Sequence, residues 1–173
     1  MEIFSLGTCM LEQGCQIKEL RLGVLNRLAE KTIAVDRKGE IIDLYYKVAS
    51  NNSFIAEWIN TMTMHPESFE CHVDVIPDSI PRDDVEVFIY MASVVNSESN
   101  LILYSKAILD KTKYNWESPY TIIYNDTRIV VLDRKLALKA LGCNGAASIE
   151  IYIDSIVAKE KSQIKNVRKN GKL

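Results

Sequence analysis

The side chains in this sequence that could bind a metal or act in catalysis are its cysteines, its two histidines and its scattered acids. No two cysteines form a C-x-x-C pair, so their spacing favours buried free thiols over a structural zinc site. His65 and His72 stand in segments typical of loops, and no serine or cysteine is arranged with either of them as a nucleophile. Gly39 stands alone, so the sequence offers no glycine-rich phosphate loop. The cysteines are Cys9, Cys15, Cys71 and Cys143.

The overall charge does not favour nucleic-acid binding, because the net charge is −2 over 173 residues. Any contact with nucleic acid would need a local basic patch. The segment after Val157 is such a patch, with six basic residues against one acid. It is either a solvated end of the chain or an arm that binds phosphate or an acidic partner. The candidate binding residues of this arm are Lys161, Lys165, Arg168 and Lys169.

Strand-like and helix-like segments alternate along the chain. Short runs of β-branched and apolar residues predict strands, and apolar residues at helical spacing predict helices. This order predicts an α/β fold with a parallel sheet that carries helices on both faces. Residues 72–76 form a further short extended piece, and residues 120–124 are either a strand or a loop insertion. We expect strands over residues 3–11 (with a break at Gly7), 31–36, 100–105 and 129–132, and helices over residues 16–30, 40–49, 54–62, 81–95 and 133–141.

Composition is that of a globular protein, with 47% apolar and 25% charged residues. A chain of this length buries enough surface for a core without disulfides. No apolar run reaches about 18 residues and the first residues lack a basic segment, so we expect a cytoplasmic protein with no membrane contact. We divide the chain into a domain over residues 1–142 and an extension over residues 143–173 with a basic end. The pattern near Ile151 fits a strand and a helix equally well.

Four segments, in this order, resemble the PIN nuclease domains, in particular a bacterial subgroup found in defence or toxin-type loci. Residues 3–11 (IFSLGTCML) are similar to the family's opening strand, which ends in Asp-Thr-Asn. Residues 33–45 (IAVDRKGEIIDLY) are similar to the subgroup's strand, Asp-x-x-Gly turn and helix with an acid beside Tyr. Residues 83–92 (DDVEVFIYMA) resemble the helix that presents an acid before a small residue. Residues 101–106 (LILYSK) resemble the strand that delivers the last acid.

The resemblance implies a three-layer fold with a central, mostly parallel sheet and helices on both faces. In that family, acids at one sheet edge hold Mg²⁺ or Mn²⁺ for hydrolysis of RNA. The corresponding positions here are Gly7, Asp43, Asp84 (with Asp83 as its alternate) and Lys106. Gly7 offers no side-chain oxygen, and Lys106 replaces an acid by an ammonium group. An ammonium about 4 Å from a divalent cation costs on the order of 8 kcal/mol at a dielectric constant of about 20, so we expect no metal here and no catalytic residues.

A second alignment is compatible with an active enzyme. Residues 120–126 also resemble a strand that ends in an acid, and Asp126 would then restore one carboxylate. An active Mg²⁺- or Mn²⁺-dependent ribonuclease with a shifted site would use Asp43, Asp84 or Asp83, and Asp126.

The favoured hypothesis is a catalytically degenerate PIN-like domain that acts as a binding or scaffolding subunit. The resemblance implies a protein partner such as a nuclease or an ATPase, with RNA as another, in a prokaryotic defence or toxin-type complex. It also suggests a homodimer. A third hypothesis is an interaction domain without nuclease ancestry, in which Gly7, Asp43, Asp84 and Lys106 would not converge.

Overall fold

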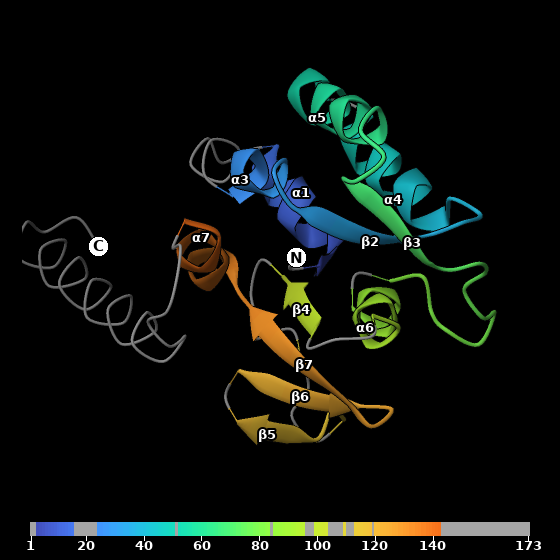
Figure 1. Ribbon diagram of the computed structural model, residues 1–173, viewed down its shortest axis with the longest axis vertical. Coiled ribbons are helices and arrows are strands. Elements are labelled where there is room, and N and C mark those ends of the chain that lie inside the picture. Colours follow the sequence, from blue (N-terminus) through green and yellow to red (C-terminus); the bar gives the residue numbers. More distant parts are fainter. Residues whose placement is uncertain are drawn as a thin grey trace, which may run out of the picture.

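The computed structural model describes residues 3–15, 24–50, 52–83, 85–95, 99–103, 109, 113–118 and 120–142 (Figure 1). Strands and helices alternate along most of this part of the chain, as the sequence pattern predicts. The elements are β1 (Ile3–Leu6), α1 (Thr8–Gly14), α3 (Asn26–Leu28), β2 (Thr32–Asp36), α4 (Glu40–Ala49), α5 (Ser53–Thr63), β3 (Phe69–Val73), α6 (Glu86–Ser93), β4 (Ser99–Ile102), β5 (Trp116–Ser118), β6 (Thr121–Tyr124), β7 (Thr127–Leu132) and α7 (Arg134–Gly142).

The strands form one seven-stranded sheet in the order β3-β2-β1-β4-β7-β6-β5. Strands β3, β2, β1, β4 and β7 run parallel to one another, whereas β6 pairs antiparallel with β7 and β5 pairs antiparallel with β6. The prediction of an α/β fold with a mostly parallel sheet is therefore confirmed. Figure 1 shows β3 at one end of the sheet and the β5–β6 hairpin at the other.

The first strand is shorter than its sequence suggests, because Gly7 ends it. The Gly7 amide makes the last bond to β4, donating to Ile102 O at 2.9 Å, and its carbonyl accepts from Met10 N at 3.1 Å. The break predicted at Gly7 is therefore confirmed, but the chain then turns into α1, so the prediction of strand from there to Leu11 is wrong. Met10 and Leu11 are both fully buried, which explains why their apolar run imitates a strand.

Residues 120–124, which sequence left open between a strand and a loop, contain strand β6. A two-residue turn joins β6 to β7, with φ of 48° at Asn125 and 60° at Asp126. Positive φ at both positions belongs to the tight turn that matches the twist of paired strands, and asparagine and aspartate tolerate it. The sequence analysis missed β5, which lengthens the antiparallel end.

Helix α6 begins at Glu86 and not at Pro81 as predicted. Arg82 holds the preceding loop by donating to the carbonyl oxygens of Ile76, Pro77 and Ile80, and to Glu40 at 2.7 Å. The Asp83 carboxylate then accepts from Val85 N and Glu86 N at 2.9 and 2.7 Å. These side-chain hydrogen bonds hold the chain around Pro81 in a loop, and the helix therefore begins only at Glu86.

Two of the predicted helices, α5 and α7, are confirmed, and a side chain caps each of them. Asn52 caps α5 by accepting from Ile55 N at 3.0 Å, and Asp133 caps α7 by accepting from Leu136 N at the same distance. The extended piece predicted at residues 72–76 is shifted, since β3 runs from Phe69 to Val73. In the described part of the chain, no helix is long and apolar enough to cross a membrane.

Candidate functional site

The topology of the sheet directs attention to the carboxyl ends of its parallel strands. Strand β1 lies between β2 and β4, and the chain builds outward from β1 first in one direction and then in the other. Ligands of open α/β sheets bind outside the carboxyl ends of strands at such a switch point. The candidate site is therefore the edge where β1, β2 and β4 end.

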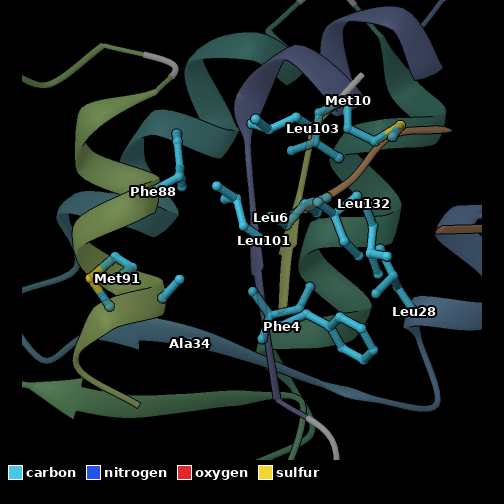
Figure 2. Close-up of a cluster of buried hydrophobic side chains, with 14 of the residues drawn as sticks. Phe4, Leu6, Met10, Leu28, Ala34, Phe88, Met91, Leu101, Leu103 and Leu132 are labelled. Atoms are coloured by element: carbon cyan, nitrogen blue, oxygen red, sulfur yellow. The ribbon is translucent and has the colours of Figure 1, made fainter. Parts of the chain in front are cut away.

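Gly7 ends β1 at this edge, and its surroundings leave little room for a side chain. A Cβ atom at Gly7 would lie 2.8 Å from Leu103 Cδ2 and 3.3 Å from Ile102 O. Leu103 is fully buried and belongs to the core cluster that Figure 2 shows beside Met10. An apolar side chain therefore fills the space that an acid at position 7 would enter.

Tyr45 of α4 occupies the place where β1 and β2 separate. The register of these strands ends at Phe4 and Ile33, so the Leu6 carbonyl has no partner in β2. The Tyr45 hydroxyl donates to Leu6 O at 2.7 Å, and its ring stacks on Phe88 of α6 at 6.0 Å between centroids. Tyr45 is fully buried, and burial raises the pKa of its hydroxyl far above the ordinary value. The Tyr45 hydroxyl thus donates to the Leu6 carbonyl the hydrogen bond that a backbone amide of β2 would otherwise donate.

Replacing Tyr45 with phenylalanine should lower the free energy of unfolding by about 2 kcal/mol, because the Leu6 carbonyl is left buried and unpaired. Tyr46→Phe is the matched control on the same helix. The Tyr46 hydroxyl donates to Asn60 Oδ1 at an exposed position, so its loss should change stability by less than about 0.5 kcal/mol. Urea denaturation of both variants measures the difference, and equal effects would contradict the role assigned to Tyr45.

The stability that the Tyr45 hydroxyl contributes should depend on pH. Unfolded tyrosine ionises near pH 10 whereas the folded Tyr45 stays neutral, so its stabilising effect is complete below about pH 10 and declines above it. At about pH 11 the stability difference between wild type and Tyr45→Phe should shrink by about 1.4 kcal/mol. Denaturation curves from neutral to alkaline pH test this; a constant difference would contradict it.

Asp36, the last residue of β2, has a buried carboxylate that accepts hydrogen bonds from the first turn of α4. It is 2% exposed and accepts from Glu40 N at 3.0 Å and from Ile41 N at 2.9 Å. These are amides of the first helical turn, which have no partner within the helix. Asp36 is thus a capping residue as well as part of the turn that the sequence predicts.

A cluster of Glu86, Lys113 and Tyr114 lies at the start of α6, with Glu86 and Tyr114 buried and Lys113 exposed. Because α6 connects the end of β3 to the start of β4, its first turn lies toward the carboxyl edge. The Glu86 side chain is 11% exposed and forms an ion pair with the Lys113 ammonium. The buried Tyr114 hydroxyl donates to the same carboxylate oxygen at 2.6 Å. The Lys113 ammonium also lies 5.1 Å from the centre of the Tyr114 ring.

Of the residues that sequence analysis proposed, the structure describes Gly7, Asp43, Asp83 and Asp126, and these four do not form one site. Asp43 is exposed in α4, and Asp83 is exposed and caps α6. Asp126 lies in the turn before β7, at the amino edge of the parallel strands and so opposite the end of β1. The remaining candidates lie outside the described residues; these are Asp84, Lys106, Lys161, Lys165, Arg168 and Lys169.

Sequence analysis missed the cluster of Glu86, Lys113 and Tyr114. One signal was present, since Glu86 interrupts a run of apolar helical residues from Val85 to Met91. An acid on a buried helix face needs a partner, and its spacing alone does not say which one.

Among the described residues, no three histidine, cysteine, aspartate or glutamate side chains gather in a way that could hold a metal ion. Comparison of the sequence with models of known protein families finds no match, and comparisons with curated proteins and with solved structures find no similar protein.

Proposed function

We propose that this chain is a catalytically degenerate PIN-like domain that acts as a binding or scaffolding subunit. The observation that carries the proposal is the ion pair of Glu86 and Lys113, which puts an ammonium group on a buried carboxylate near the edge where the family holds its metal. Protein cation and protein anion neutralise each other there, so the carboxylate is not available to a dication.

The arrangement around β1 supports a PIN-like three-layer fold. The Ser5 hydroxyl donates to the Phe88 carbonyl of α6 at 2.7 Å, so Ser5 faces α6. Phe4, the preceding residue, points to the other side, where Figure 2 shows Leu28 of α3. Neighbouring residues of one strand thus meet helices on opposite faces, as the resemblance implies.

Mg²⁺ or Mn²⁺, which the family uses, fits the described residues poorly. Such ions take several oxygen ligands, commonly two or more carboxylates with water. Gly7 provides no oxygen, Asp36 is occupied by two helix amides and Glu86 by a lysine and a tyrosine. Asp43 remains as an exposed acid, and among the described residues it belongs to no group of three or more ligating side chains that could hold a metal ion. We derive no hydrolytic step from this set.

Adding Mn²⁺ or Mg²⁺ should therefore leave the melting temperature unchanged. A metal at 100 times its dissociation constant would add about 2.7 kcal/mol to the stability of the folded state, which is a shift of several degrees. Isothermal titration with Mn²⁺ should likewise show no binding above that of the Asp43→Ala variant. Micromolar affinity that disappears in Asp43→Ala or Glu86→Gln would overturn the proposal, as would chelator-sensitive cleavage of single-stranded RNA.

The binding role needs its own test. We expect the purified full chain to retain a protein partner from its own genomic neighbourhood, or single-stranded RNA, equally well with and without EDTA. RNA anisotropy and co-purification of neighbouring gene products measure this. The defence or toxin-type context comes from the resemblance alone, and retention of neither class of partner would remove the support for a scaffolding role.

A further inference from the structure

A cavity of about 220 Å³ lies at the amino edge of the parallel strands, on the opposite edge of the sheet from the candidate site. Its walls are the connection from α3 to β2 and the connection from α5 to β3. Pockets for drug-sized ligands measure about 300–1,000 Å³, so this cavity fits a smaller molecule or a single side chain. Its described lining includes Glu30, Lys31, Thr32, His65, Glu67 and Ser68.

Hydrogen bonds between the two connections hold these walls together. The Thr32 hydroxyl donates to Glu67 O at 2.9 Å, and Ile33 N donates to Ser68 O at 2.8 Å. Within the second connection, Ser68 N donates to His65 O at 3.0 Å. The cavity is therefore preformed, and binding would not have to order its walls.

Ser68 supplies the observation that points to a ligand. The residue is 3% exposed, and its hydroxyl has no hydrogen-bond partner among the described residues. Its backbone N–H and C=O groups are both bonded, so the hydroxyl is the polar group that Ser68 offers to the cavity. Buried hydroxyl groups are normally hydrogen-bonded, and the oxygen of this one is available to a donor on a ligand.

The charges of the lining favour a cation. Glu30 and Glu67 bring one exposed carboxylate from each connection. Lys31 makes an interaction of its own, and with a neutral His65 the two acids and one lysine give the described lining a net charge of −1. Helix α5 ends just before His65 with no basic residue in its last turn, and this end of a helix carries negative partial charge.

A guanidinium group fits this set of acceptors better than a metal ion does. In the described part of the chain, no three histidine, cysteine or acidic side chains gather in a way that could hold a metal ion. A guanidinium group carries five N–H donors in a planar fork. It can therefore donate to carboxylates on two chain segments and to the Ser68 hydroxyl oxygen at the same time.

We propose that this cavity binds a guanidinium group, carried by a small molecule or by an arginine side chain of a partner protein. Glu30 and Glu67 accept hydrogen bonds from it at the rim, and Ser68 accepts from it inside the cavity. Guanidinium binding here does not depend on the proposed function, because the cavity and the Glu86 cluster lie at opposite edges of the sheet.

The test is an NMR titration of the isotopically labelled full chain at low salt with n-butylguanidinium. It should bind with a dissociation constant of about 1 mM and shift the amide signals of residues 29–32 and 65–68. The matched probe n-butylurea has the same shape without the charge and should leave these signals in place.

A peptide distinguishes the two sources of the group. If acetyl-Gly-Arg-Gly-amide binds at least as tightly as n-butylguanidinium, the cavity takes an arginine side chain of a protein. Weaker binding of the peptide assigns the cavity to a small molecule. The same peptide with citrulline in place of arginine is the uncharged control.

Variants test the residues assigned to the site. Glu67→Gln should weaken binding about threefold and Glu30→Gln/Glu67→Gln about tenfold, as expected for exposed ion pairs. Ser68→Ala should weaken binding about tenfold without lowering the melting temperature, because its hydroxyl has no partner to lose among the described residues. Glu57→Gln removes an exposed acid of α5 outside the described lining and should change neither property.

Three results would overturn the proposal. The first is the absence of any shift at millimolar n-butylguanidinium, and the second is equal binding of n-butylurea. The third is a set of variants in which Ser68→Ala binds like wild type, or in which Glu57→Gln weakens binding as much as Glu67→Gln does. That last pattern would mean a general attraction of cations to the protein.

Discussion

Replacing Gly7 with aspartate should destabilise the fold by about 3 kcal/mol and should not restore a metal site. The new Cβ would lie 2.8 Å from Leu103 Cδ2, and the backbone oxygen of Ile102 lies 3.3 Å from the same point. The leucine must move, and a carboxylate is then placed among buried apolar atoms. Chemical denaturation measures the loss, and titration with Mn²⁺ measures whether any affinity appears.

Two further variants separate crowding from charge. Gly7→Ala adds the Cβ alone and should cost about 1 kcal/mol, since only overpacking remains. In the double variant Gly7→Asp/Leu103→Ala, the cost should be smaller than the sum of the single costs by about 1 kcal/mol, because residues in contact are coupled. Additive costs, or a stable Gly7→Asp protein that binds Mn²⁺, would show that Leu103 does not close this position.

Much of the fold can be predicted from the sequence because its signals are local. Helix α4 follows from a β-branched strand, a turn ending at Gly39 and apolar residues at helical spacing, and Gly39 does adopt φ of 90°. The segment up to Leu11 was predicted as strand because Met10 and Leu11, which lie in α1, are both buried. A short run of buried apolar residues has the same sequence pattern in a helix as in a strand.

The candidate site could be predicted only in part, because it depends on contacts between distant segments. The absence of an acid at Gly7 is visible in the sequence, but Leu103 as the group that fills its space is not. The sequence pointed to Lys106 as the cation of the edge, and that residue lies outside the described ones. The ion pair of Lys113 with Glu86 was not predicted. Which lysine meets a buried acid is decided by the path of the chain, and periodicity does not encode that path.

Replacing Glu86 with alanine should lower the free energy of unfolding by about 3 kcal/mol. The change leaves the buried Tyr114 hydroxyl without its acceptor and removes the anion that neutralises Lys113. Glu57→Ala, a change at an exposed acid of α5, is the control and should cost less than about 0.5 kcal/mol. Glu86→Gln keeps an acceptor for Tyr114 and should lie between the two.

The apolar replacement of the whole cluster distinguishes a structural ion pair from a carboxylate kept for chemistry. Glu86→Leu/Lys113→Met/Tyr114→Phe removes the carboxylate, the ammonium and the hydroxyl together, so most of the stability lost in Glu86→Ala should return. Lys113→Met alone should cost about 1 kcal/mol, less than Glu86→Ala, because the lysine side chain is 56% exposed and water can take its place. Recovery in the triple variant, with partner or RNA binding intact, would mean that Glu86 serves the fold. A variant that recovers stability but loses binding would instead place this cluster in the binding surface, because the partner or the RNA would then require its charged groups.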